Sequence, residues 1–140
     1  SIKVVYQEQQ FHQKAISYFM KALKLFKKGG DKKMLAATSF KIGMNYYQTY
    51  DHDKAQSFYV KAVKIQKEFY GDYHPEVADM MYNIGVVQLD IGGVNEALDK
   101  FMAAFLIRCL VFGNIRTNVI EVLHRIALIH DLKNEERNLF

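Results

Sequence analysis

Histidines are the side chains of this 140-residue chain best suited to acid–base or metal chemistry. They are His12, His52, His74, His124 and His130. None has zinc-type spacing or an H-E-x-x-H context, and Cys109 is the single cysteine. Zinc needs several closely spaced ligands, and a nucleophile needs a base beside it. The sequence also lacks a glycine-rich phosphate loop and a G-x-S-x-G motif. We therefore expect no enzymatic activity, no cofactor and no metal.

Lysines recur along the first half of the chain. Lys14, Lys21, Lys24 and Lys28 are followed by Lys54, Lys61, Lys64 and Lys67. Residues 1–70 hold thirteen Lys/Arg against five Asp/Glu, a balance of +8, whereas residues 71–140 hold six against ten, a balance of −4. A basic stripe can bind phosphates, but the aromatic residues here fall at core-facing spacings and offer no stacking platform. We interpret the lysines as a solvated convex face, and nucleic acid is the weaker partner hypothesis.

The elements that position these residues are helices arranged in repeats. Segments 13–25, 53–65 and 95–107 align at offsets of 40 and 42 residues. A second set, Phe40–Gly43, Tyr82–Gly85 and His124–Ala127, recurs every 42 residues between them. Two alternating helix types, each with its own small residues, are typical of stacked helical hairpins.

Small residues in this register predict close helix packing. Gly43, Gly85 and Ala127 are expected to let one helix lie against its hairpin partner, with bulky residues such as Tyr59 and Phe101 filling the space between. Glycine inside a helix costs about 1 kcal/mol relative to alanine. Its repeated occurrence therefore indicates a packing role.

The pattern predicts helices at about 11–28, 34–50, 53–70, 76–91, 95–112 and 118–131. Breaks are expected at Gly29-Gly30-Asp31, Tyr50-Asp51-His52, Gly71 to Pro75, Gly92-Gly93 and Gly113-Asn114. Residues 1–9 match the second half of a preceding helix by register. We expect residues 1–140 to form a single array of about three hairpins that is a piece of a longer protein.

The repeat resembles the tetratricopeptide repeat (TPR) in its form of about 42 residues. The junction Gly71-Asp72-Tyr73-His74-Pro75-Glu76-Val77-Ala78, followed by Asn83-Ile84-Gly85, resembles repeats of the kinesin light chain type. The resemblance implies an all-α, right-handed superhelix of stacked antiparallel hairpins. It also implies that the inner helices line a concave groove that binds peptides.

Lys41, Asn83 and Arg125 occupy one position in three successive inner helices, and the resemblance places this position in the groove. An asparagine amide can both donate to and accept from an extended peptide, while Lys41 and Arg125 favour a carboxylate. Glu121 lies one turn before Arg125 and could neutralise it. The predicted peptide-binding residues are Lys41, Met44, Tyr47, Tyr82, Asn83, Val86, Leu89, His124, Arg125 and Leu128.

We expect a scaffold or adaptor module whose partner is a protein or peptide with acidic residues or a free C-terminus. The alternative is a peptide-sensing regulatory domain of a bacterial signalling protein, because residues 37–47 loosely resemble hairpins of response-regulator phosphatases and their quorum-sensing relatives. No apolar run is long enough to cross a membrane, and no signal-peptide pattern is visible. With a lone cysteine, these features favour a cytoplasmic protein without a membrane partner.

Overall fold

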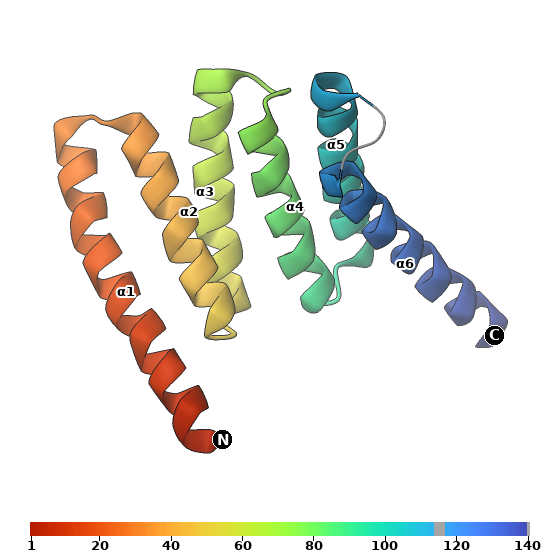
Figure 1. Cartoon of the computed structure of the whole chain (residues 1–140), viewed down its shortest axis with the longest axis horizontal. Helices are drawn as coiled ribbons and strands as arrows, with labels where there is room; N and C mark the ends of the chain where they lie inside the picture. The colour runs from red at the N-terminus through yellow and green to blue at the C-terminus, as the bar shows by residue number, and fades with distance from the viewer. Residues whose placement is uncertain (114–116, 140) are drawn as a thin grey trace. The chain divides into compact units, whose positions relative to one another are not determined.

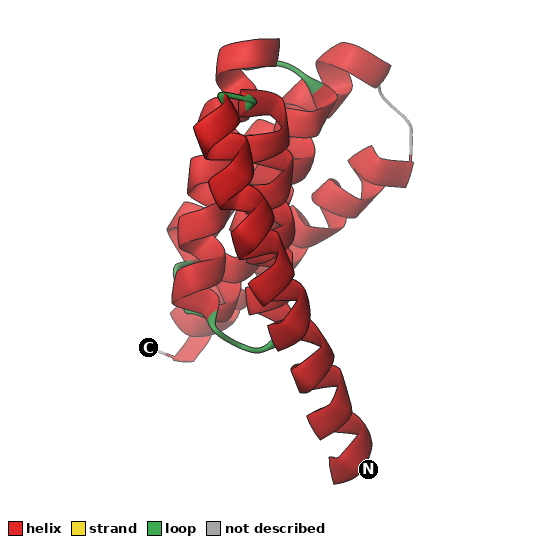
Figure 2. Ribbon diagram, turned by 90° about the vertical axis from the view of Figure 1, so that its left-hand side faces the viewer, coloured by secondary structure: helices red, strands yellow, loops and turns green. Residues whose placement is uncertain are grey.

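The computed structural model describes residues 1–113 and 117–139, which form helices joined by short turns (Figures 1 and 2). The helices are α1 (Ile2–Gly29), α2 (Lys32–Gln48), α3 (His52–Tyr70), α4 (Pro75–Asp90), α5 (Val94–Phe112) and α6 (Thr117–Leu139). No strand occurs among these described residues, so the predicted all-α class is confirmed. The chain divides into two compact units, Ser1–Phe69 and Tyr70–Phe140.

Local chemistry at the helix ends explains most of these boundaries. The Ser1 and Asp31 side chains accept hydrogen bonds from the first turns of α1 and α2. Gly30 ends α1 in the left-handed region with φ 73°, which glycine adopts without a steric penalty. Pro75 opens α4 as predicted, and the ring of His74 accepts from the Glu76 N–H.

The first helix differs from its prediction. The register placed residues 1–9 in a separate helix, but α1 runs without interruption from Ile2 to Gly29 (Figure 1). Segment 7–13 consists mainly of Gln and Glu, which favour helix, and contains no glycine or proline that would form a turn. The repeat register was therefore a poor guide where the turn residues of later hairpins are missing.

The last helix also extends further than predicted. The sequence pattern ended it near residue 131, whereas α6 continues to Leu139. Lys133, Glu135, Glu136 and Arg137 are good helix formers, and no breaker separates them from the rest of the helix. At the junction before α6, Gly113 ends α5 as expected, while Asn114 lies outside the described residues.

In the first unit, α1 and α3 both pack against α2. The ring of Tyr59 lies over Gly43, and its ring centroid is 5.1 Å from that of Phe40. Tyr59 is only 2% exposed, and Ala36 and Ile42 of α2 are fully buried. The glycine thus allows α3 to approach α2 closely enough to bury an aromatic ring, as predicted.

The second unit repeats this arrangement. The fully buried ring of Phe101 on α5 lies over Gly85 of α4, and α6 adds the fully buried Val122 and Ile129 to the same core. Ala127, which shares the register of the two glycines, is exposed on α6. No helix within the described part of the chain is long and apolar enough to span a membrane.

Candidate peptide-binding surface

Seven of the ten predicted peptide-binding residues lie on α4 and α6 of the second unit. Four of them follow one another along one side of α4, namely Tyr82, Asn83, Val86 and Leu89. All four side chains are half-buried. Side chains that are half-buried can contact a partner while their buried parts still pack against the protein.

The hydroxyl group of Tyr82 connects α4 to α6. Arg125 donates its Nε–H to this oxygen over 3.2 Å, and the hydroxyl donates in turn to Oε1 of Glu121 over 3.4 Å. The Arg125 guanidinium lies 6.0 Å from the centre of the Tyr82 ring. Glu121, one turn before Arg125 on α6, thus contacts the tyrosine hydroxyl. Arg125 has no ion pair with a carboxylate among the residues that the structure describes.

A second arginine, Arg108, also packs against the ring of Tyr82. Arg108 of α5 is 4% exposed, and its guanidinium lies 5.4 Å from the centre of the Tyr82 ring. Its Nη2 is 2.7 Å from Oδ1 of Asp79, whose side chain is 61% exposed. Burying an arginine is costly unless a partner compensates its charge, and Asp79 supplies that partner at the edge of the surface.

The sequence interpretation missed Arg108 and Asp79, although the pattern contained a signal for the arginine. Arg108 follows Ala97, Phe101 and Ala104 at helical spacing, and all three are fully buried. Gln66 holds the same register on α3 and is also buried. A polar residue on the inner face of both helices indicates a buried polar contact, and arginine requires an acidic partner nearby.

Asn83 is oriented by its own helix. Its Nδ2 donates to the backbone carbonyl of Asp79, one helical turn earlier, over 2.8 Å. This hydrogen bond fixes the orientation of the amide group. The side-chain oxygen has no hydrogen-bond donor among the described residues. The amide therefore retains an acceptor for an N–H group of a partner.

Apolar and polar groups alternate around these hydrogen bonds. Leu128 lies on the same face of α6 as Arg125 and is 41% exposed, and His124 beside it is also exposed. Val86 and Leu89 provide apolar area on α4. The surface of the second unit thus offers a positioned guanidinium, a carbonyl acceptor and separate apolar patches.

The remaining three predicted residues lie on α2 in the first unit. Lys41 is exposed, with its ammonium group 5.8 Å from the centre of the Phe19 ring, and Met44 is 45% exposed on the same side of the helix. Tyr47 is half-buried, and its ring centroid is 5.5 Å from that of His52. Lys41 and Met44 are therefore accessible together, whereas the Tyr47 ring packs against the start of α3.

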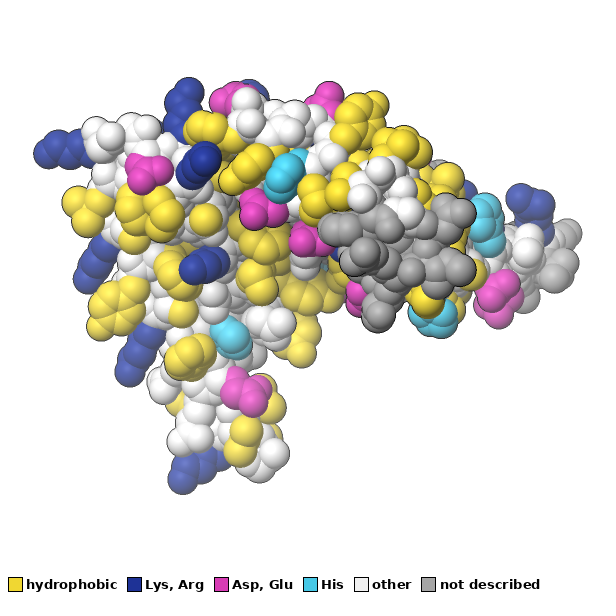
Figure 3. Space-filling view, turned by 45° about the horizontal axis from the view of Figure 1, so that its top comes forward, with side chains coloured by type: hydrophobic (Ala, Val, Ile, Leu, Met, Phe, Trp, Pro, Cys, Tyr) yellow, Lys and Arg dark blue, Asp and Glu magenta, His cyan; other side chains and the backbone are white. Residues whose placement is uncertain are grey.

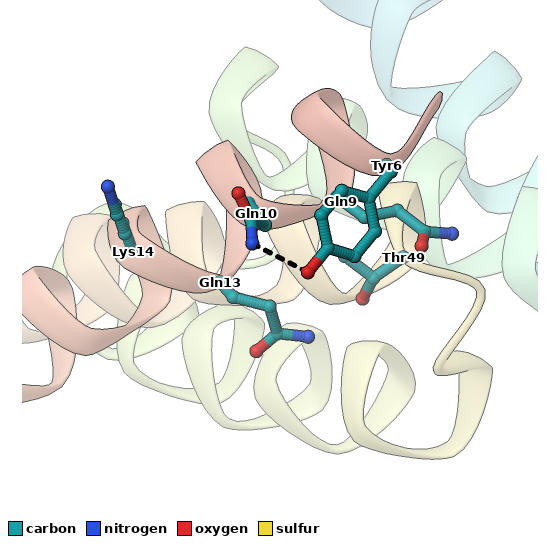
Figure 4. Close-up of a pocket in the computed structure, with 6 residues that line it drawn as sticks. All are labelled: Tyr6, Gln9, Gln10, Gln13, Lys14 and Thr49. Atoms are coloured by element: carbon teal, nitrogen blue, oxygen red, sulfur yellow. Dashed lines mark hydrogen bonds between the residues drawn. The ribbon is translucent and has the colours of Figure 1, made fainter. Parts of the chain in front are cut away.

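Two pockets of the first unit contain none of the ten predicted residues. One has a volume of about 490 Å³ and a polar lining from α1 that includes three glutamines, with Thr49 at the end of α2 (Figure 4). Within it, Gln10 donates to the Tyr6 hydroxyl over 2.9 Å. The other pocket lies between α1, α2 and α3. No group of three potential metal ligands occurs in the described parts of the chain.

Comparison with known proteins identifies a repeat family. The family model for the tetratricopeptide repeat matches residues 2–68 and 34–109. A comparison with curated proteins finds no significant relative. The overlapping matches cover most of the described hairpins, in agreement with the resemblance read from the sequence.

Solved structures share the fold at low sequence identity. The crystal structure of BtubC (BKLC) from P. vanneervenii has a TM-score of 0.82 and 19% identity, over 89% of this chain and 51% of that one. A kinesin light chain candidate from Podosopora anserina, with nearly identical TPR-like repeats, has a TM-score of 0.78 and 14% identity, over 97% of this chain and 66% of that one. The chain thus spans about half to two thirds of the length of these proteins.

Proposed function

The chain belongs to the tetratricopeptide repeat family, and from this premise we propose that it is a non-catalytic scaffold or adaptor module that binds a peptide segment of another protein. The hairpins are proposed to act as a single array. The proposed binding surface of the second unit comprises Asn83 and Arg125 with the apolar residues around them. In the first unit, Lys41 and Met44 of α2 are proposed as peptide contacts of their own.

The observation that carries this proposal is the position of Arg125 relative to Tyr82. The tyrosine hydroxyl accepts from Nε and leaves the two terminal nitrogens of the guanidinium without a described partner. A guanidinium fork held in this way can bind a carboxylate with two parallel hydrogen bonds. The entropy cost of ordering the side chain is largely met before the partner arrives.

The neighbouring groups favour a peptide over a small molecule. Asn83 presents a carbonyl oxygen that suits a backbone N–H of an extended chain, and a peptide has such groups at regular spacing. Leu128 and Val86 provide contact area for its side chains. The ligand supported best is an extended peptide with an acidic side chain or a free C-terminus opposite Arg125.

A library of peptides with free and amidated C-termini tests this proposal. Wild-type protein is screened first, and the peptides it selects are titrated against Asn83→Ala, Arg125→Ala and Lys41→Ala. Removing Asn83 leaves a peptide N–H unpaired, so we expect a loss of about 1–3 kcal/mol in binding free energy. Arg125→Ala is expected to weaken the binding of peptides with a free carboxylate more than the binding of their amidated forms.

Matched controls come from the far side of α6. Asn134→Ala and Arg137→Ala remove the same residue types from exposed positions outside the proposed surface, and they are expected to bind like wild type. If selected peptides bind Asn83→Ala and Arg125→Ala as tightly as wild type, the surface on α4 and α6 is not the binding site.

A further inference from the structure

The second pocket of the first unit is lined by apolar residues and lysines, none of which belongs to the proposed peptide surface. It is a groove of about 460 Å³ between the C-terminal half of α1, the N-terminal half of α2 and the part of α3 from Phe58 to Glu68. This volume lies within the range of about 300–1,000 Å³ found for ligand sites. Every residue that lines it belongs to the unit Ser1–Phe69.

The floor of the groove is apolar. It is formed by Leu23 of α1, Leu35 of α2 and Ile65 of α3, all half-buried, together with Phe58. The Phe58 ring is stacked on Tyr46, with 5.7 Å between ring centroids. Apolar side chains that remain partly open to water gain free energy when a partner covers them.

The rim of the groove is basic. Four lysines line it, namely Lys27, Lys32, Lys61 and Lys64, against one carboxylate, Glu68. The Lys61 ammonium lies 5.1 Å from the centre of the Phe58 ring. None of the four forms an ion pair with a carboxylate in the described part of the chain. Lysine side chains also alternate with hydrophobic ones along the left-hand edge of Figure 3, where α1 lies, so the basic character of this unit is not confined to the groove.

Within α2, the residues that line this groove and the proposed contact residues Lys41 and Met44 lie on different sides of the helix. Leu35 and Ser39 face the groove and lie one helical turn apart. Lys41 is two residues beyond Ser39 and points about 200° around the helix from it, and Met44 lies close to the same direction. A ligand in the groove therefore leaves the Lys41 side of α2 free.

We propose that the groove is a second docking site, which binds an acidic peptide segment carrying one or two apolar side chains between Asp or Glu residues. The apolar side chains cover Leu23, Leu35 and Ile65, while the carboxylates lie near the four rim lysines. Charge complementarity supports this occupant, because the unit carries thirteen lysines and five carboxylates, a balance of +8. A partner that brings negative charge to the rim relieves the repulsion between the lysines.

The geometry favours a peptide over the other anionic macromolecules. Single-stranded RNA requires exposed aromatic faces for stacking, but the Phe58 ring already contacts Tyr46 and the Lys61 ammonium. A membrane surface is bound by apolar side chains that project into it, whereas the apolar residues here form the floor of a recess. Side chains of a peptide can enter such a recess.

The test uses a fluorescein-labelled peptide in which a leucine–phenylalanine pair is flanked by runs of glutamate. We expect saturable binding to the whole chain, seen by fluorescence anisotropy and weakened by added salt. Replacing every glutamate by glutamine, or the apolar pair by serine, should abolish most of the binding. Shifts of the Leu23, Leu35 and Ile65 methyl resonances should accompany it.

Charge reversal locates the site. Lys27→Glu/Lys64→Glu should weaken binding of the peptide roughly tenfold or more, because attraction between its glutamates and these two lysines becomes repulsion. Lys21→Glu/Lys28→Glu is the matched control, since it makes the same change in net charge at exposed positions of α1 outside the groove. It should weaken binding by less than about threefold, the effect of net charge alone.

Several results would overturn the proposal. These are equal weakening by the two double variants, methyl shifts that bypass the groove, or no binding even at low salt. Phosphatidylserine vesicles or single-stranded RNA that displace the peptide at physiological salt would assign the rim to lipid or nucleic acid instead. The proposed α4–α6 surface is distinguished by its own readout, because a peptide bound there shifts the methyl resonances of Val86 and Leu128, whereas a peptide in the groove shifts those of Leu23, Leu35 and Ile65.

Discussion

The ring of Phe101 lies directly over Gly85, and its nearest carbon is 2.8 Å from where a Cβ atom on that glycine would stand. Phe101 is fully buried, so its ring can give way to a methyl group only by displacing other atoms of the core. At this position a hydrogen atom is the only substituent that fits. The same relationship holds in the first unit, where two carbons of the Tyr59 ring lie 2.7 Å from the corresponding point on Gly43.

Gly85→Ala should therefore destabilise the protein although alanine is the better helix former. The gain in helix propensity is about 1 kcal/mol, whereas overpacking a tight core costs about 1–3 kcal/mol, and a larger residue such as valine costs more. Chemical denaturation monitored by circular dichroism should show a lower free energy of unfolding. Gly29→Ala is the control, because no atom lies within 4 Å of its added methyl group, and it should be neutral or stabilising. A Gly85→Ala protein as stable as Gly29→Ala would show that α4 and α5 do not touch there.

Tyr59 should make the protein sensitive to alkali. Burial, with a smaller contribution from the neighbouring Tyr47, raises the pKa of the Tyr59 hydroxyl above its ordinary value of 10.0. Above pH 10 the unfolded chain loses this proton while the folded chain keeps it, so the unfolded state binds fewer protons. Stability is therefore fully present below pH 10 and falls as the pH rises further, by up to about 1.4 kcal/mol per pH unit.

Tyr59→Phe should remove this part of the alkaline dependence. Phenylalanine is suited to the site, because Phe101 holds the same register over Gly85. At pH 7 the free energy of unfolding should change by less than about 1 kcal/mol. Urea denaturation of both proteins from pH 8 to pH 11 measures the difference, and Tyr18→Phe, at a 70% exposed ring, controls for tyrosine ionisation in general. Parallel stability curves for wild type and Tyr59→Phe would contradict the assignment.

The sequence was sufficient to predict features that depend on local spacing. The register of Gly43 and Gly85 predicted which helices pack closely, and Pro75 marked the start of α4. The predicted break between residues 1–9 and the helix from residue 11 was wrong, because α1 is continuous. Segment 7–13 contains no turn-forming residue, and the repeat register alone does not specify a turn there. The contact between Tyr82 and Arg125 joins residues 43 positions apart. It depends on how α4 and α6 pack, which residue types at their own positions do not specify.

Removing only the carboxylate of the ion pair between Asp79 and Arg108 should destabilise the protein more than removing both charged groups. Asp79→Ala leaves the nearly buried guanidinium without its carboxylate, so the free energy of unfolding should fall by about 1–3 kcal/mol. Asp79→Ala/Arg108→Met removes the charge as well and should recover part of this loss. Asp99→Ala, at an exposed position of α5, is the matched control. If Asp79→Ala is no less stable than Asp99→Ala, water compensates the arginine and the ion pair is dispensable.

Tyr82→Phe should separate peptide binding from stability. The substitution removes only the hydroxyl that holds Nε of Arg125, and Phe40 at the same register of α2 shows that a phenylalanine ring fits a helix of this type. Stability should change by less than about 1 kcal/mol. Peptides with a free C-terminus or an acidic side chain should bind several-fold more weakly, because the guanidinium must then be ordered during binding at a cost of about 0.5–1.5 kcal/mol.

A double-mutant cycle checks that this effect passes through Arg125. Binding of one selected peptide is measured by titration calorimetry for wild type, Tyr82→Phe, Arg125→Ala and the double variant, with the amidated peptide in parallel. If the hydroxyl acts by positioning the guanidinium, Tyr82→Phe should have almost no effect once Arg125 is alanine, and the two changes should not be additive. Amidation at the recognised carboxylate should reduce the Tyr82→Phe effect in the same way. Additive losses, or an equal loss for the amidated peptide, would mean that the tyrosine contacts the peptide itself and that Arg125 needs no help to reach its carboxylate.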